Sequence, residues 1–262
     1  MTVQVTVSGP SRHGVRAAAA SHGGRVRARN EDAFLLDDRR DLYAVSDGVG
    51  GLPGGQTASG IVVAALPELL EQVERVGPAG DGEREQGLCL ALSDLSRTVR
   101  EEAVRAGLAG MGATVVLAVV RGEAVTVAHL GDSRAYRLGP GGLVALTGDH
   151  SVVGILVRQG EISANEARVH PARGRITRFV GMEDDIDAET ATVSFAPGDR
   201  LLLCSDGLTG EVGDERLADL LGATRGDPGA ACRLLIEEAL GTGARDNVTV
   251  VVADRPGDAG EE

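Results

Sequence analysis

Lysine is absent from this sequence of 262 residues, and all 26 of its basic residues are arginine. A phosphate-binding loop of the GxxxxGK(S/T) type needs a lysine, as do enzymes that form a Schiff base or use lysine as a catalytic base. The missing lysine therefore excludes these classes of nucleotide-binding and catalytic site.

A positive net charge and long apolar runs are also missing. The formal net charge is −13, which argues against nucleic acid or an anionic membrane surface as a partner. Apolar runs such as 113–120 are far shorter than the roughly 20 residues that cross a bilayer. The N-terminus lacks the basic, then apolar, then small-residue pattern of a secretion signal. These absences predict a protein without a membrane span, located in the cytoplasm.

Cysteine is scarce, and the chain shows no internal repeat. Cys89, Cys204 and Cys232 lie in apolar contexts without a CxxC pair, so we expect buried, reduced thiols. A chain of this length with 42% apolar residues can bury one sizeable core. We therefore expect a single domain.

Strand and helix patterns occur in blocks along the chain. Strands are predicted at 25–36, 41–45, 113–120, 123–130, 133–138, 190–195, 199–204 and 247–253. Apolar residues at helical spacing predict helices at 57–75, with Thr57 as the cap, and at 88–106, 214–222 and 228–240. The dipeptides RG and GD between the strands of 113–138 predict antiparallel hairpins. Together these patterns indicate antiparallel sheets covered by helix pairs.

Residues 149–181 are polar and carry few strand signals, so we expect a mobile flap over a site. The flap begins with the consecutive residues Asp149, His150 and Ser151. Members of a catalytic triad must meet in space with nucleophile, base and orienting group in line, which three neighbours rarely do. We interpret this tripeptide as the turn that starts a helix.

The glycine cluster GVGGLPGG at 48–55 does not predict a dinucleotide site. Pro53 stands where the third glycine of GxGxxG would be, and no βαβ pattern follows.

Two apolar runs, YAVSDG and LLLCSDG, end in the same tripeptide Ser-Asp-Gly. They place Asp47 and Asp206 at the ends of predicted strands, and RDNVTVVV places Asp246 at the start of another. Each aspartate alone has an ordinary explanation as a turn residue. Three carboxylates at the ends of core strands can, however, converge, and hard oxygen ligands of this kind suit Mg²⁺ or Mn²⁺.

Other acidic residues have a structural and a functional interpretation. Glu31 and Asp32 follow Arg27 and Arg29 in RARNEDAF, a pattern that also fits a solvated strand edge. Asp132 in HLGDSRAYRL also fits an ordinary hairpin turn.

The order of these motifs is more specific than any one of them. NED, SDGVGG, GATVV, GDSRAY, DHS, TRFVG, CSDGL and RDNVTV follow one another at spacings that resemble the metal-dependent serine/threonine protein phosphatases of type 2C. The resemblance covers roughly residues 20–253, and DGVGG is similar to the bacterial branch of the family. It implies an α+β fold, a four-layer αββα sandwich of two antiparallel sheets flanked by helix pairs.

The resemblance also implies roles for particular residues. Asp47 would bridge two Mn²⁺ or Mg²⁺ ions, and the carbonyl of Gly48 would bind one of them. Asp206 and Asp246 would bind the other ion, and Glu31 and Asp32 would hold the metals or their waters. Asp132 would bind a third metal ion together with Asp206 and the flap. Arg27 would bind the substrate phosphate.

The reaction implied by the resemblance is hydrolysis of phosphoserine and phosphothreonine in proteins by direct attack of a metal-bridging hydroxide. Many eukaryotic members have a histidine after Asp-Gly that is proposed as the general acid, whereas Val49 occupies that position here. We expect a metal-bound water to protonate the leaving alcohol instead. A second departure, TRFVG, is expected to alter packing only.

Two alternatives stay open at this point: a non-catalytic protein-binding relative of the same fold, and a hydrolase of small phosphomonoesters. The expected partners are phosphorylated proteins, substrates of a bacterial serine/threonine kinase, and the expected state is a monomer. We expect an N-terminal extension at 1–15, a catalytic domain at 16–254 that includes the flap, and an acidic tail at 255–262.

Overall fold

The protein is described from a computed structural model, which covers residues 3–49, 54–76, 80–182 and 187–257. One sheet contains β1 (Val5–Pro10), β2 (Arg16–His22), β7 (Arg134–Gly139), β8 (Gly142–Ala145), β10 (Arg200–Cys204) and β11 (Val248–Asp254). The other contains β3 (Asp32–Asp37), β4 (Leu42–Asp47), β5 (Val115–Arg121), β6 (Ala124–Leu130) and β9 (Glu189–Ser194). The helices are α1 (Gly55–Val76), α2 (Asp81–Ala106), α3 (Val152–Arg158), α4 (Ala164–Val169), α5 (Asp206–Thr209), α6 (Asp214–Ala223) and α7 (Pro228–Thr242).

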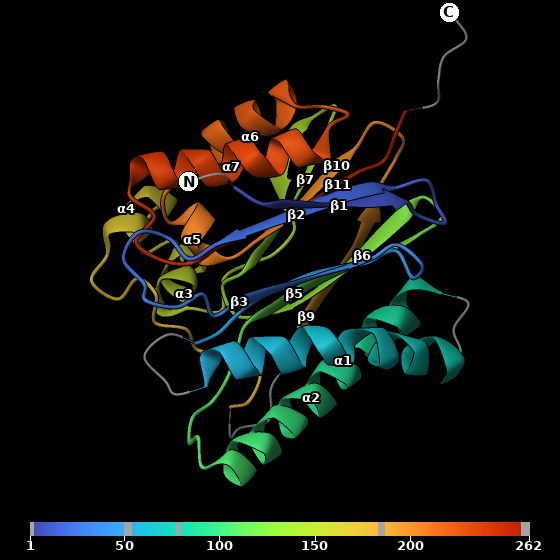
Figure 1. Ribbon diagram of the computed structural model, residues 1–262. Coiled ribbons are helices and arrows are strands. Elements are labelled where there is room, and N and C mark those ends of the chain that lie inside the picture. The colour runs from blue at the N-terminus through green and yellow to red at the C-terminus, as the bar shows by residue number, and fades with distance from the viewer. Residues whose placement is uncertain (1–2, 50–53, 77–79, 183–186, 258–262) are drawn as a thin grey trace, which may run out of the picture.

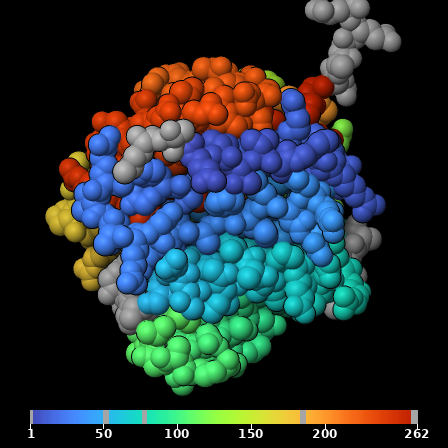
Figure 2. Space-filling model, in the orientation of Figure 1, coloured from blue at the N-terminus to red at the C-terminus, as the bar shows by residue number. Residues whose placement is uncertain are grey.

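The two sheets face each other, and helices cover both outer faces (Figure 1). The six-stranded sheet has the order β1-β2-β11-β10-β7-β8 and lies under α6 and α7. The five-stranded sheet has the order β3-β4-β5-β6-β9 and is covered by α1 and α2. Figure 2 shows the same layers on one face, with α1 and α2 in cyan and green below the N-terminal strands in blue. The predicted α+β fold, a four-layer αββα sandwich, is confirmed.

Alternating side chains of β5 belong to two different cores. Val115 and Leu117 pack with α1 and α2, whereas Val116 and Ala118 pack in the core between the two sheets. Successive side chains of a strand point to opposite faces, so a strand that is buried on both faces is apolar throughout. This explains why the run at 113–120 shows no polar alternation.

The first helix begins earlier than its sequence pattern indicates. α1 starts at Gly55, so Thr57 lies inside its first turn and the predicted cap is wrong. A Cβ atom on Gly48 would come within 2.5 Å of the carbonyl carbon of Gly55. This close approach brings the start of the helix directly against the end of β4.

Several strands differ from their predicted positions. The strand predicted at 25–36 is confirmed only for β3, since residues 25–31 lie outside any strand. β1, β2 and β8 were not predicted. β2 begins with Arg-Ala-Ala-Ala-Ala, and alanine has little preference for strands, so only the position of β2 next to β11 reveals it.

The predicted hairpin at Gly131 and Asp132 is wrong. β6 pairs with β5 and β9, whereas β7 pairs with β8 and β10, so these residues carry the chain from one sheet to the other. The hairpin between β5 and β6 is confirmed. The crossing places Asp132 where both sheets end on the same side.

Residues 149–181 contain the two short helices α3 and α4. The Oγ of Ser151 accepts a hydrogen bond of 3.0 Å from the backbone N–H of Gly154 and caps α3, which confirms the predicted helix-start turn. The mobility of the flap stays a prediction. Two statements from the sequence fall partly outside the described residues: the glycine cluster, at its residues 50–53, and the acidic tail, at its residues 258–262.

All three cysteines are free thiols, as predicted. Cys204 and Cys232 are buried, and burial raises the pKa of each thiol to about 12, while Cys89 is half-buried. Within the described parts of the chain, no helix has the length and apolar character that a membrane span requires.

Candidate metal centre

Asp32 and Asp47 are direct neighbours in the five-stranded sheet. The first residue of β3 and the last residue of β4 are cross-strand partners in the antiparallel register. The backbone around Asp47 is held by Thr114, whose Oγ1 accepts the N–H of Asp47 at 3.0 Å and whose N–H donates to the Asp47 carbonyl at 2.8 Å. The two carboxylates are therefore fixed side by side by strand pairing.

Asp206 reaches the same place from the opposite sheet. It follows β10, and the preceding residue, Ser205, donates a hydrogen bond of 2.9 Å from its Oγ to Oδ2 of Asp32. Hydrogen bonding to Asp47 is among the influences on the pKa of both Asp32 and Asp206. The repeated Ser-Asp-Gly thus marks the ends of two strands from different sheets that meet in space. Gly207 is tightly packed, because a Cβ there would lie 1.8 Å from the carbonyl oxygen of Asn247.

Arg27 and Asp246 form the outer side of the site. Nη2 of Arg27 donates to Oδ2 of Asp246 at 2.7 Å, and this contact raises the pKa of the guanidinium. The other oxygen of Asp246 accepts the N–H of Asn247 at 2.9 Å. The negative charges of Asp47 and Asp206 also act on Arg27, so its guanidinium lies beside the cluster of carboxylates.

Glu31 and Gly48 lie next to each other at the end of β4. The N–H of Gly48 donates to the carbonyl of Glu31 at 3.2 Å. The Glu31 carboxylate lies against Gly55, where a Cβ would come within 3.2 Å of Oε2. Only glycine at position 48 permits this contact between the strand end and α1.

Asp132 is buried at the crossing between the sheets. Burial raises its pKa well above the usual range for a carboxyl group, and the charges of Asp206 and Asp149 add to the effect. The neighbouring Ser133 shares a hydrogen bond of 2.7 Å with Thr114, which also holds Asp47. The structure therefore connects the predicted third-metal ligand to the same framework.

Three side chains that the motifs did not single out hold the site together. They are Thr114, Ser205 and Asn247. Oδ1 of Asn247 accepts the N–H of Glu31 at 2.9 Å, and its Nδ2 donates to the carbonyl oxygens of Gly23 and Arg29 at 3.0 and 2.9 Å. Asn247 directly follows Asp246 in RDN, and this position next to a predicted metal ligand was the signal that could have pointed to it. A buried asparagine side chain needs hydrogen-bond partners of this kind.

The electrostatics of the site favour a bound cation. Burial raises the pKa of Asp32 to about 6, and burial followed by repulsion from Asp32 raises that of Asp47 well above its usual value. Burial and the charge of Asp246 raise the pKa of Asp206. Oδ1 of Asp32 is buried without any hydrogen-bond partner. Oxygen ligands in a desolvated, mutually repelling group fit Mn²⁺ or Mg²⁺, since a divalent cation would neutralise them.

Comparison with known proteins gives a consistent answer. The family profile described as Protein phosphatase 2C matches residues 21–225. This chain belongs to that family.

Named relatives agree with the family match. The phosphatase is 35% identical over 236 residues to the serine/threonine phosphatase Stp of Listeria welshimeri, covering 88% of this chain and 92% of the relative. It is 37% identical over 246 residues to the serine/threonine protein phosphatase PstP of Mycobacterium tuberculosis, covering 92% of this chain but 45% of the relative. The family and enzyme class expected from the sequence are confirmed.

A solved structure bears on the cofactor. The catalytic domain of PstP in complex with two manganese ions superimposes with a TM-score of 0.74 at 34% identity, over 96% of this chain and 99% of that one. The expected use of Mn²⁺ or Mg²⁺ in this family is confirmed. Which residues of the present phosphatase bind the ions stays a prediction.

Proposed function

We propose that this phosphatase hydrolyses phosphoserine and phosphothreonine in proteins, with two Mn²⁺ or Mg²⁺ ions in its core site. The observation that carries the proposal is the group of half-buried carboxylates formed by Asp32, Asp47 and Asp206, which come from both sheets and have no cationic partner among their described hydrogen bonds. Folding brings like charges together here at a cost in stability, which is typical of a functional site.

The proposed roles follow the position of each side chain. Asp47, in the middle, would contact both ions, with the Gly48 carbonyl on one of them. Asp206 and Asp246 would hold the other from the six-stranded sheet. Glu31, Asp32 and Asp132 complete the set, with Asp132 serving a third, weaker ion. Arg27 would bind the substrate phosphate and contribute to catalysis at the transition state.

When bound, the cations supply Lewis acidity, which lowers the pKa of water and neutralises phosphoryl charge. The chain's own residues orient the reaction. Arg27 presents a planar guanidinium, suited to two phosphoryl oxygens, and its contact with Asp246 limits its rotation. The ring nitrogens of His150 are both engaged in protein contacts, so it is poorly placed to protonate the leaving alcohol. Val49 carries no titratable group, which leaves water as the proposed acid.

The direct test is Mn²⁺-dependent release of phosphate from phosphothreonine and phosphoserine peptides, with Asp47→Ala and Asp206→Ala as controls. We expect activity that EDTA abolishes and that both substitutions remove. Activity that persists in EDTA, or in both variants, contradicts the proposed mechanism.

Replacement of Arg27 by lysine is expected to lower kcat/KM about 100-fold, because a lysine ammonium cannot bind two phosphoryl oxygens in a planar, bidentate manner. Arg25→Lys is the matched control, since Arg25 lies two residues away and donates to the Leu240 carbonyl instead. Steady-state kinetics with a phosphothreonine peptide checks this prediction. An unchanged kcat/KM in Arg27→Lys would show that Arg27 acts only through its charge, and equal losses in both variants would show a general effect on the loop.

A cavity of about 480 Å³ beside the metal centre favours a peptide substrate over a small phosphomonoester. Asp132 and Asp206 line one part of it, and the flap lines another with Arg158, Arg168 and Arg173. Arg158 and Arg173 donate to backbone carbonyls at 2.8 and 3.2 Å, and none of the three forms an ion pair with a carboxylate among the described residues. Arg158 and Arg168 are therefore available to the acidic side chains or the backbone of a bound phosphoprotein, whereas the charge of Arg173 also acts on Asp206, where it partly offsets the rise in pKa caused by burial.

Arg158→Ala combined with Arg168→Ala is expected to raise KM for a phosphopeptide with acidic flanking residues by about tenfold, because charge-assisted hydrogen bonds are lost. The same variant should hydrolyse p-nitrophenyl phosphate as well as the wild type does. Arg97→Ala on α2, in an exposed pair with Asp94, serves as the control. An equal effect on both substrates would favour the alternative of a small phosphomonoester hydrolase.

The remaining alternative, a non-catalytic binding relative, is disfavoured because its carboxylates would be expected to be incomplete. The following statements stay proposals: that a bacterial serine/threonine kinase phosphorylates the substrates, that the phosphatase is a cytoplasmic monomer, and that the catalytic domain spans 16–254. A domain boundary at residue 16 would separate β1 from the sheet that also contains β10 and β11.

A further inference from the structure

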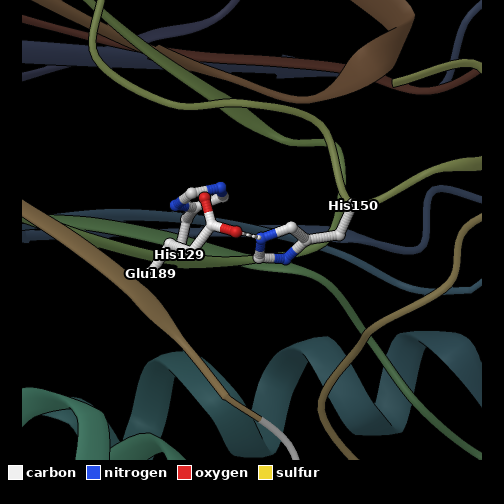
Figure 3. A group of neighbouring side chains, drawn as sticks. All are labelled: His129, His150 and Glu189. Carbon is white, nitrogen blue, oxygen red and sulfur yellow. Dashed lines mark ion pairs between the residues drawn. The ribbon is translucent and has the colours of Figure 1, made fainter. Parts of the chain in front are cut away.

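His129, His150 and Glu189 form a second group of ionisable side chains, separate from the carboxylates of the metal centre. Their ligand atoms lie within 4.8 Å of one another (Figure 3). His129 is on β6, His150 is at the start of the flap, and Glu189 is the first residue of β9. Both histidines are buried, so the group needs an explanation.

The geometry of the group argues against a metal ion at this place. The two imidazole rings are stacked, with centroids 4.5 Å apart and an interplanar angle of 18°. Imidazole lone pairs lie in the ring plane, so those of two nearly parallel rings do not converge on one ion. In addition, the Arg178 guanidinium lies 3.1 Å from Oε1 of Glu189 and 3.4 Å from Nε2 of His150, so a positive charge is already present.

The hydrogen bonds define the protonation state of His150. Its Nδ1 accepts the backbone N–H of Gly131 at 3.2 Å, so the proton must reside on Nε2, which faces Oε1 of Glu189 at 3.1 Å. A metal ion on Nε2 would require the proton to be on Nδ1. The Nδ1–H would then face the backbone N–H of Gly131, and neither group could accept a hydrogen bond. Burial, together with His129, lowers the pKa of His150 to about 4, which keeps the ring neutral.

His129 supports this arrangement from the side. Its Nε2 lies 2.9 Å from the carbonyl oxygen of Gly148, which can only accept, so Nε2 carries the proton. The stacked ring then fixes the plane of His150, while Glu189 fixes which nitrogen of His150 carries its proton.

The backbone of His150 also bonds Gly131 and in addition reaches the end of the flap. Its N–H donates to the Gly131 carbonyl at 2.9 Å, and its own carbonyl accepts the N–H of Thr177 at 2.7 Å. Gly131 has φ +112, and a Cβ there would lie 2.6 Å from the side chain of Thr114. Gly131 is thus held between Thr114 and His150, and Asp132 is the next residue.

We propose that His150 is a positioning residue, oriented by Glu189 and His129, which holds Gly131 so that Asp132 can bind the third metal ion. The inference rests on the proposed function of Asp132. Because His150 also bonds Thr177, it joins both ends of the flap to that ligand.

The test compares three substitutions at position 150. An asparagine side chain can place an oxygen near the site of Nδ1 and accept the Gly131 N–H, whereas glutamine reaches toward Nε2, and alanine does neither. The affinity of the weakest Mn²⁺ site, measured by isothermal titration calorimetry, is expected to fall about tenfold or more in His150→Ala and His150→Gln. It should stay close to the wild-type value in His150→Asn.

A double-mutant cycle tests whether the effect passes through Asp132. If it does, Asp132→Ala together with His150→Ala binds Mn²⁺ no more weakly than Asp132→Ala alone. His170→Ala is the matched control, since His170 lies in the flap and its Nδ1 accepts the N–H of Ala172 without touching Gly131. The imidazole ¹⁵N shifts of the wild type should report the tautomer protonated on Nε2.

Four results overturn the inference: no weak Mn²⁺ site in the wild type, equal losses in the asparagine and alanine variants, an additive double mutant, or the Nδ1-protonated tautomer. Calorimetry and NMR do not depend on turnover. Absence of phosphatase activity with intact Mn²⁺ binding would therefore contradict the proposed function and leave the test of His150 valid.

Discussion

Replacing Asp47 with asparagine is expected to lower kcat for a phosphothreonine peptide by about 1,000-fold or more at saturating Mn²⁺. Asp47 is the carboxylate whose pKa is affected by Asp32, Asp206, Asp132 and Asp246 together, so its charge acts on every predicted ligand around it. Steady-state phosphate release measures the effect.

The same substitution should raise the thermal midpoint of the metal-free protein at pH 7.5. In the wild type, desolvation and the charge of Asp32 both destabilise the ionised Asp47 carboxylate. An uncharged amide removes this repulsion. Inactivity with a higher midpoint separates a lost ligand from a lost fold.

The matched control for Asp47 is Asp41→Asn. Asp41 is buried more deeply than Asp47 and precedes the opposite end of β4, where it bonds Ser11 and His13. Asparagine tolerates its backbone φ of +46. This variant should lose stability and keep its kcat. Activity of Asp47→Asn above a tenth of the wild-type value would contradict the central role of Asp47.

Mn²⁺ is expected to raise the thermal midpoint by about 5 to 10 °C at pH 8 when present at a hundredfold excess over Kd. At pH 5 the rise should be much smaller, because protons then compete for the same oxygens. Differential scanning fluorimetry with EDTA and with Mn²⁺ across this pH range makes the comparison. Asp47→Asn should remove most of the effect.

The sign of this pH dependence follows from raised carboxyl pKa values. Asp32, with a folded-state pKa of about 6 against an ordinary 3.8, binds a proton in the folded state that the unfolded chain has released. The stabilisation from this proton is present below pH 3.8 and is lost as the pH rises through about 6. Asp47 and Asp132 have pKa values raised in the same direction. The metal-free protein therefore gains least from these groups at pH 8, where a cation can replace the protons, and an equal Mn²⁺ effect at both pH values would contradict this account.

Most of the fold follows from local patterns. Helices α6 and α7 and strands β5, β6, β9, β10 and β11 were predicted within a few residues, because their apolar periodicity reflects burial. Helix α2 was predicted correctly at its end but begins at Asp81 instead of residue 88, because its first two turns are polar and rich in glycine and charge. β2 was missed because its central alanines carry no strand preference, and the Gly131 turn was misread because a short loop looks the same whether it closes a hairpin or crosses between sheets.

The site was predictable through motif order more than through any single residue. Asp47 and Asp206 could be paired because each ends an apolar run, and the structure brings them together. Ser205 and Thr114 could not be found, since their role lies in hydrogen bonds between segments far apart in the sequence. His129 begins the stretch HLGDSRAYRL, but nothing in that stretch indicates a role for it, and only its stacking on His150 reveals one.

Asp32 and Asp47 end strands of one sheet, while Asp206 and Asp246 flank strands of the other. A cation bound by carboxylates from both sheets would hold the two sheets together, and the stability that it adds would increase with the metal concentration. A distant substitution in the core between the sheets could displace one sheet slightly relative to the other. The first measurable effect of this displacement would be a lower affinity for the metal.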